Sequence, residues 1–216
     1  APNHLDWHTD MEEYVQAKRN LVAHQTAGGR VVLNADNAYT AAYAEGLDNV
    51  FWFSRRHPVE RGAFLRDDGV LVMRDGGADT EICSRADILL RGDHNVENYL
   101  AAVCAVWGYV PVEVIVQYAR TFGGVAHRCE LVRVRGGAEW YNDSIGSSPS
   151  RTIAGLKAFT QKVVLIAGGY DKHIPYDPLG PVAADTVKCA ILMGATAGAI
   201  ETAIRAHSDL PIYRVG

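Results

Sequence analysis

The chain has 216 residues, of which 48% are apolar and 21% charged, and its formal net charge is −4. This length can bury one large core or two smaller ones, and the composition is ordinary for a soluble globular protein. The net charge argues against a nucleic-acid surface, which would be basic, but small anionic substrates need only a local basic cluster. No apolar run reaches about 18 residues, so we expect no membrane span.

A capping-box pattern at Thr9 and Glu12 predicts the start of a helix that ends at Gly28-Gly29. Asp68-Gly69 predicts the turn of a β-hairpin, and Pro111 predicts the first residue of a helix. The other elements expected in this half are strands over 30–34 and 49–54, a short helix over 38–45, and helices over about 95–108 and 111–121.

Gly123-Gly124 is the best candidate for a domain boundary, because a new series of predicted strands and helices begins after it. We therefore expect one domain over residues 1–123 and a second over 124–216. The second domain should contain strands over 129–135, 138–143, 163–169, 187–194 and 213–216, and helices over 149–159 and 196–207. Its apolar strands are separated by helix-compatible segments, which predicts a parallel α/β sheet.

Four cysteines are scattered along the chain without a CxxC pair or a histidine partner at zinc spacing. Their default interpretation is that of core thiols in a reducing compartment. The chain opens APNHLDWHTD, without a methionine or the basic region of a signal peptide. We expect this opening to lie in the middle of a longer protein.

Lys18 lies four residues after Tyr14 and three before Leu21, on the apolar face of the first predicted helix. Its stem could pack while its amine reaches water, or the lysine could be held at a site and modified. The preceding stretch HLDWH (4–8) could place two side chains on one face of a strand as a cation site, although such a cluster is more often a polar loop.

Asn95 and Asn98 lie at i and i+3 near the start of a predicted helix. The apolar residues expected to pack lie on another face of this helix: Val96, Tyr99, Leu100 and Val103. The two asparagine amides can project together and offer the donors and acceptors that a purine edge requires. The alternative is that asparagine simply favours helix starts.

Two loops could bind an anion. NDSIGSSPSRT (142–152) leads into a helix and combines exposed backbone amides with three serines and Arg151. AGGYDKH (167–173) follows an apolar strand, where α/β folds place their ligand crevice, and offers Lys172 and His173. The alternative explanation for the first loop is that it only caps the helix, and for the second that it is only a tight turn at the end of a strand.

Together and in this order, these motifs resemble the Mur ligases. The resemblance rests on HLDWH, YVQAK (14–18), GDHNVEN (92–98), GVAHRCE (124–130), NDSIGSSPSRTIAGL (142–156) and IAGGYDKH (166–173). The NDSI-x-SSP and AGGYDK forms are similar to those of the member that adds D-glutamate. The resemblance spans essentially the whole chain.

The resemblance implies an ATP-dependent amide ligase that uses Mg²⁺. Its substrates would be UDP-N-acetylmuramoyl-L-alanine and D-glutamate, joined through an acyl phosphate in the synthesis of the peptidoglycan precursor. Such an enzyme serves cell-wall growth, cell shape and cell division from the bacterial cytoplasm. The implied fold is the later part of a central ATPase domain (1–123) followed by an incomplete Rossmann-like C-terminal domain (124–216).

The resemblance also implies roles for individual residues. His4 and Lys18 would hold magnesium, Lys18 as a carbamate whose formation is favoured by burial of the amine. Adenine would lie at the helix that carries Asn95 and Asn98, with Asn98 favoured over Asn95 as the contact to the base. The residues that contact the nucleotide phosphates and ribose would be His127, Arg128 and Asp143. Those that bind D-glutamate or the transferred phosphate would be Ser147, Arg151 and Lys172.

Two departures from the family pattern stand out. Ile145 occupies a position where some relatives have lysine, and Arg151 could replace that charge. No G-x-x-x-x-G-K-[ST] motif occurs in the 216 residues, so we expect a fragment that is inactive by itself. The nearest alternative function is that of another Mur-type or folylpolyglutamate-type ligase. An alternative from a different functional class is a binding fragment without catalytic activity.

Overall fold

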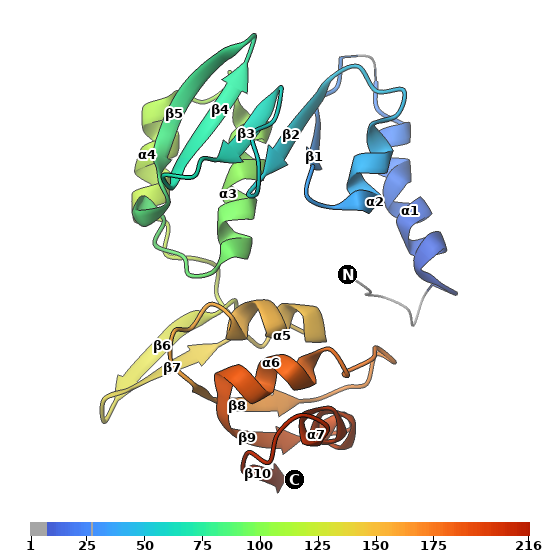
Figure 1. Ribbon diagram of the computed structural model, residues 1–216, viewed down its shortest axis with the longest axis vertical. Helices are drawn as coiled ribbons and strands as arrows, with labels where there is room; N and C mark the ends of the chain where they lie inside the picture. Colours follow the sequence, from blue (N-terminus) through green and yellow to red (C-terminus); the bar gives the residue numbers. More distant parts are fainter. Residues whose placement is uncertain (1–7, 27) are drawn as a thin grey trace. The chain divides into compact units, whose positions relative to one another are not determined.

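The structure is a computed structural model that describes residues 8–26 and 28–216. The chain forms two compact units (Figure 1). One is built from residues 15–123, and the other from residues 124–216 together with residues 8–14. Each unit has its own sheet and its own hydrophobic core.

The unit of residues 15–123 contains a five-stranded sheet in the order β1-β2-β3-β4-β5. The first three strands are parallel, and β4 and β5 continue the sheet antiparallel. The elements up to residue 123 are α1 (Met11–Ala23), β1 (Val31–Asn34), α2 (Ala38–Ala41), η1 (Ala42–Ala44), β2 (Val50–Ser54), β3 (Gly62–Leu65), β4 (Val70–Asp75), β5 (Ala78–Ser84), η2 (Arg85–Asp87), α3 (Asp93–Val106) and α4 (Val112–Thr121).

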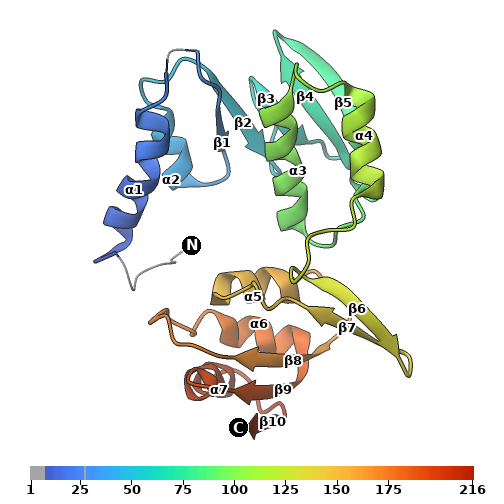
Figure 2. The same cartoon turned by 180° about the vertical axis from the view of Figure 1, so that it is seen from behind.

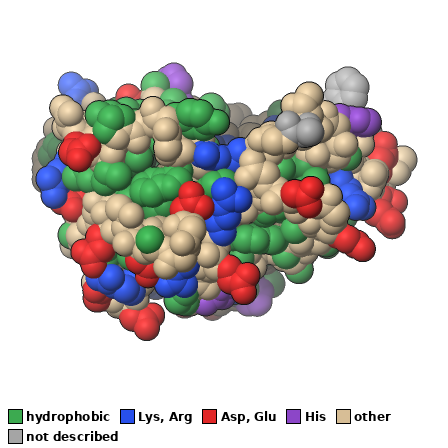
Figure 3. Space-filling view, turned by 90° about the horizontal axis from the view of Figure 1, so that it is seen from above, with side chains coloured by type: hydrophobic (Ala, Val, Ile, Leu, Met, Phe, Trp, Pro, Cys, Tyr) green, Lys and Arg blue, Asp and Glu red, His purple; other side chains and the backbone are tan. Residues whose placement is uncertain are grey.

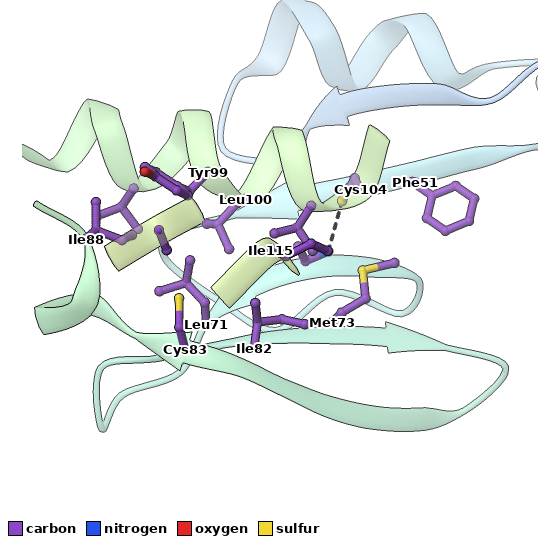
Figure 4. Close-up of a cluster of buried hydrophobic side chains, with 14 residues drawn as sticks. Phe51, Leu71, Met73, Ile82, Cys83, Ile88, Tyr99, Leu100, Cys104 and Ile115 are labelled. Atoms are coloured by element: carbon purple, nitrogen blue, oxygen red, sulfur yellow. Dashed lines mark hydrogen bonds between the residues drawn. The ribbon is translucent and has the colours of Figure 1, made fainter. Parts of the chain in front are cut away.

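Helices α3 and α4 cover one face of this sheet (Figure 2). Val96, Leu100 and Val103 recur at helical spacing along α3 and are at most 2% exposed. They meet apolar side chains of the sheet, among them Leu71 and Met73 (Figure 4). Each fully buried side chain of this kind contributes about 1.5–3 kcal/mol, so the packing of α3 is a main source of the unit's stability.

The end of α3 is fixed by polar contacts. Arg30 donates hydrogen bonds to the carbonyl oxygens of Cys104 (2.9 Å) and Trp107 (2.7 Å), which have no partner inside the helix. The thiol of Cys104 accepts a hydrogen bond from the Ala63 N–H at 3.2 Å (Figure 4). It also lies 3.3 Å from the Trp52 carbonyl oxygen. Burial raises the pKa of this thiol to about 12, so it remains protonated at neutral pH.

The interpretation of the cysteines as core thiols is confirmed for two of the four. Cys83 and Cys104 are buried, whereas Cys129 and Cys189 are partly exposed, and none of the four forms a disulfide. The interpretation is wrong for the second pair because Cys129 follows a surface turn and Cys189 lies on a strand face that its helices do not cover fully.

Tyr99 contributes most of its ring to the core but leaves its hydroxyl without a hydrogen-bond partner among the described residues. Burial also raises the pKa of this phenol. An unsatisfied buried hydroxyl typically costs about 1–3 kcal/mol. We therefore expect Tyr99→Phe to raise the free energy of unfolding by about 1 kcal/mol, measured by urea denaturation. A loss of stability in this variant would show that the hydroxyl has a partner.

Residues 124–216 form a second unit. A three-stranded parallel sheet has the order β10-β9-β8, and β6 and β7 form a separate antiparallel ribbon. The parallel sheet expected from the sequence is thus confirmed. The elements are β6 (Glu130–Arg135), β7 (Ala138–Asn142), α5 (Pro149–Leu156), β8 (Val163–Gly168), α6 (Leu179–Thr186), β9 (Val187–Met193), α7 (Ala197–Arg205) and β10 (Ile212–Val215).

Some local predictions are wrong by one residue or more. The helix α1 is capped by Asp10, whose carboxylate accepts the Glu13 N–H at 2.8 Å, while Glu13 itself reaches back to Thr9. The predicted capping box is therefore shifted by one position. Pro111 is the residue before α4 rather than its first residue. Strand β5 and helix α6 were not predicted.

Acidic and basic side chains lie interspersed over one face of the molecule (Figure 3). Among the ion pairs of the strands, Arg66 contacts Asp68 and Glu81, both at 2.7 Å, and Arg74 contacts Asp79 at 2.6 Å. Such exposed pairs contribute little stability. In the part of the chain that the structure describes, no helix is both long and apolar enough to cross a bilayer.

Candidate functional site

The N-terminal end of α5 follows a tight polar turn over residues 143–146. The Asp143 carbonyl oxygen accepts the Gly146 N–H at 2.8 Å. A side chain at position 146 would meet the Asp143 carboxylate at 2.7 Å, so only glycine fits there without movement. Ser148 then precedes α5 in an extended conformation, and Pro149 opens the helix at a position that needs no amide hydrogen.

Lys172 lies next to this helix start. Its Nζ donates a hydrogen bond to the Ser147 Oγ at 2.9 Å, joining residues 25 apart in the sequence. Lys172 belongs to the loop after β8, at the carboxyl end of the parallel sheet. A lysine ammonium, a serine hydroxyl and a helix N-terminus together suit a carboxylate or phosphoryl group. The structure thus brings together two of the three residues predicted to bind the amino-acid substrate or phosphate.

The third of these residues, Arg151, lies exposed in the first turn of α5. Ile145, which stands where some relatives have lysine, is 50% exposed in the turn before the helix. Both positions therefore lie beside the same helix start. That Arg151 supplies the charge which Ile145 lacks stays a prediction.

His127 and Asp143 lie close together. The His127 carbonyl oxygen accepts the Ile145 N–H at 3.2 Å, and its ring Nδ1 lies 2.9 Å from the Asn142 amide nitrogen. The Asp143 carboxylate accepts the Cys129 N–H at 3.0 Å. These contacts hold the GVAHRCE turn against the end of β7, so two of the predicted nucleotide contacts come from one local structure.

The backbone of this turn is unusual. His127 and Cys129 have φ angles of 65° and 45°, in the left-handed region that non-glycine residues rarely adopt. Such conformations persist where surrounding contacts determine them, and they are frequent at functional sites. The Glu130 carboxylate, which accepts the His127 N–H at 2.7 Å, is one of these contacts. Arg128 lies between the two left-handed residues and is exposed.

Sequence reasoning assigned no role to Asn142 and Glu130, although both lie within quoted motifs. Each makes a direct hydrogen bond to His127. Their residue types alone gave no signal, because neither asparagine nor glutamate points to one particular role. Their proximity to a histidine in a left-handed turn is visible only in the folded chain.

Asn95 and Asn98 lie in the first two turns of α3, in the other unit. Asn95 is 8% exposed, whereas Asn98 is exposed. The Asn98 Nδ2 donates to the Asn95 Oδ1 at 3.2 Å, so the two amides do lie together as expected. Arg55 anchors this end of the helix through Asp93 (3.1 Å) and Glu97 (3.2 Å).

The expected burial of Lys18 is wrong for this structure. Helix α1 has no buried residue, Lys18 is exposed, and Leu21 is 79% exposed. The helical spacing of apolar residues in α1 therefore does not correspond to a buried face. His4, the predicted partner of Lys18 at a magnesium site, lies outside the described residues.

No group of three or more His, Cys, Asp or Glu side chains within residues 8–26 and 28–216 is arranged to hold a metal ion. His4 lies outside these residues, and Lys18 becomes a carboxylate-like ligand only once it is carbamylated. The magnesium ligands therefore stay a prediction.

Comparison with known sequences agrees with the motifs. Residues 1–106 match the model of the Mur ligase middle domain. The UDP-N-acetylmuramoylalanine--D-glutamate ligase of Acetivibrio thermocellus is 54% identical over 99% of the chain, and that of Clostridium novyi is 46% identical over 99%. The chain spans about half the length of these relatives, 47% in both cases.

Solved structures show the same fold at low sequence identity. MurF from Acinetobacter baumannii superposes over 100% of the chain and 49% of its own length, with a TM-score of 0.77 and 16% identity. The folylpolyglutamate synthase of Mycobacterium tuberculosis superposes over 93% of the chain and 49% of its own length, with a TM-score of 0.62 and 12% identity.

Proposed function

Because the chain belongs to the Mur ligase family, we propose that it is part of an ATP-dependent ligase that adds D-glutamate to UDP-N-acetylmuramoyl-L-alanine in peptidoglycan precursor synthesis. The observation that carries the proposal is the identity of 54% over 99% of the chain with a relative named for this reaction. The contact of Lys172 with Ser147 at the start of α5 supports it, because the reaction needs a site for anionic groups.

In the proposed reaction the carboxylate of the L-alanine residue takes the γ-phosphoryl group of ATP, which gives an acyl phosphate and ADP. The amine of D-glutamate then attacks the acyl carbon, and the tetrahedral intermediate releases phosphate and a proton to leave the amide. Negative charge gathers on oxygens in both steps, so pre-positioned cationic groups accelerate them. We assign this role to Lys172, with Ser147 holding its ammonium in place and Arg151 adding charge at the same helix start.

For ATP, each unit by itself offers groups of a suitable kind. The exposed amide of Asn98 offers a donor and an acceptor to a base, and the turn that carries His127, Arg128 and Asp143 offers groups to ribose and phosphate oxygens. Magnesium, when bound, would neutralise phosphoryl charge, and we assign His4 and a carbamylated Lys18 as its ligands. The burial argument for that carbamate finds no support, since Lys18 is exposed.

A second candidate is a related ligase of the same fold. Folylpolyglutamate synthase shares the architecture, but likeness at 12% identity shows the fold alone. The two candidates differ in substrate, since one extends a muramoyl peptide and the other a folate. A candidate from a different functional class is a binding role without catalysis.

Phosphate release by the purified ligase that contains these residues distinguishes the candidates. We expect release that requires ATP, UDP-N-acetylmuramoyl-L-alanine and D-glutamate together, with little or none when L-glutamate or meso-diaminopimelate replaces D-glutamate. Release with meso-diaminopimelate or with a folate instead would refute the assignment. A polypeptide of these 216 residues alone should release no phosphate above background, because they include no G-x-x-x-x-G-K-[ST].

A further inference from the structure

Lys172 lies in a loop that is held at both ends. The loop begins after β8, where the Gly169 N–H donates to the Met193 carbonyl oxygen of β9 at 3.2 Å. The Gly169 carbonyl oxygen in turn accepts the Thr196 N–H at 3.3 Å. Beyond Lys172, the chain is anchored by Ile174, which is 7% exposed. The backbone between these two ends therefore decides where the Lys172 side chain can reach.

A side-chain-to-backbone turn closes around Lys172. One oxygen of the Asp171 carboxylate accepts the His173 N–H at 2.8 Å, so the backbone of Lys172 lies inside a hydrogen-bonded ring. His173 has a φ of 54°, in the left-handed region that residues other than glycine rarely adopt. The Asp171 carboxylate is one of the contacts that stabilise this conformation.

The charge of Asp171 does not explain its presence beside Lys172. A carboxylate next to a site for anionic groups weakens the binding of an anion. The second oxygen of Asp171 lies 3.8 Å from the His173 Nδ1, which is too long for a hydrogen bond. What remains is the hydrogen bond to the His173 N–H, a contact that the neutral amide of asparagine can make equally well.

The turn matters for Lys172 because a lysine side chain is long and flexible. Its ammonium donates to the Ser147 Oγ at 2.9 Å, which requires the side chain to give up much of its conformational freedom. A backbone that is already fixed leaves less freedom to lose when the ammonium is held in place.

We propose that Asp171 is a positioning residue, whose hydrogen bond to the His173 N–H fixes the backbone around Lys172 and so keeps the ammonium at the Ser147 hydroxyl and the start of α5. Asp171 acts through this hydrogen bond rather than through its charge. This inference rests on the proposed role of Lys172 at the anion site of the ligase.

The test uses the ligase that contains these residues and compares Asp171→Asn, Asp171→Ala, Lys172→Ala and the double variant with alanine at both positions. Asparagine keeps an oxygen for the His173 N–H and removes the charge, whereas alanine removes both. The Asp171 side chain is 45% exposed, so its removal should leave the unit folded, which urea denaturation checks.

Asp185→Ala is the matched control. Asp185 is an exposed carboxylate near the end of α6, directly before β9 begins. It therefore lies at the amino end of the parallel strands, whereas Lys172 follows their carboxyl end. Steady-state kinetics give kcat and the KM for D-glutamate of every variant, and hydrogen exchange reports on the His173 amide.

We expect Asp171→Ala to lower kcat/KM about tenfold, because a small displacement of a positioned group is costly. The His173 amide should exchange faster in this variant, since its acceptor is lost. Asp171→Asn should keep both quantities close to those of the unaltered ligase, and so should Asp185→Ala. In the Lys172→Ala background, Asp171→Ala should lower kcat/KM no further, because Asp171 acts only through Lys172.

The outcomes separate the inference from the function on which it rests. If Lys172→Ala leaves kcat/KM unchanged, the anion site is wrongly assigned, and the inference fails with it. If Lys172→Ala is impaired but Asp171→Ala is not, the positioning role alone is refuted. Equal losses in Asp171→Asn and Asp171→Ala would also refute it, because the charge would then be the essential feature. A further loss in the double variant would show that Asp171 acts on another group, with the same consequence.

Discussion

Gly168→Ala is expected to destabilise the unit of residues 124–216 by about 4 kcal/mol or more. Gly168 ends β8 with a φ of 138°, a conformation that side chains rarely adopt. A Cβ atom there would lie 1.8 Å from the carbonyl oxygen of Met193 on the paired strand β9. Since this obstacle is backbone within the sheet, relief requires the two strands to separate at their carboxyl ends.

Gly169→Ala is the matched control for this prediction. Gly169 has a similar φ of 129°, but a Cβ atom at this position would have nothing within 4 Å. Its substitution should therefore cost only the backbone strain, about 1–3 kcal/mol. Hydrogen exchange of the β8 and β9 amides reports on this unit separately from the other one. Equal protection in the two variants would contradict the steric argument.

The fold follows from the sequence where the pattern is strong and local. The apolar runs at 163–168 and 187–193 predicted parallel strands because near-continuous apolar runs are typical of such strands, although Val164 and Ile166 of β8 are 47% and 52% exposed. Asp68-Gly69 predicted its hairpin through turn chemistry. These signals depend on neighbouring residues only, which explains their success.

The missed elements lack such signals. Strand β5 begins with Ala78 and Asp79 and is exposed over much of its first half, so its apolar content is low. It is held by pairing with β4 across the turn at Gly76-Gly77, where both glycines have positive φ. Helix α6 has eight residues with Pro181 in its first turn, too short for a clear helical period.

The candidate site could be predicted only in part. The motif resemblance named Ser147 and Lys172, but their contact depends on how the loop after β8 meets α5, which no local spacing encodes. The burial of Lys18 was inferred from helical spacing alone, and such spacing indicates a face without showing that anything covers it. The hydrogen bond of the Asn95 amide to the Arg91 carbonyl oxygen likewise involves a backbone group that sequence patterns do not report.

Lys172→Ala in the ligase that contains these residues is expected to lower kcat/KM about a hundredfold or more, equivalent to about 3 kcal/mol of transition-state stabilisation. Lys172 supplies the cation that faces the start of α5, held by the Ser147 hydroxyl at 2.9 Å. Negative charge develops on the phosphoryl and tetrahedral oxygens, so the loss should lie in kcat as well as in KM.

Two further variants show whether this loss is chemical rather than structural. Lys188→Ala removes an exposed lysine from β9 of the same unit and should leave kcat/KM unchanged. Lys172→Arg keeps the charge but replaces a compact ammonium with a planar fork, so it should recover only part of the activity. All three variants should keep the thermal stability of the parent, because Lys172 is only partly buried. A stable Lys172→Ala ligase with near-normal kcat/KM would remove Lys172 from the proposed chemistry, and the anion site at the start of α5 would then have to rely on Arg151 and the helix amides.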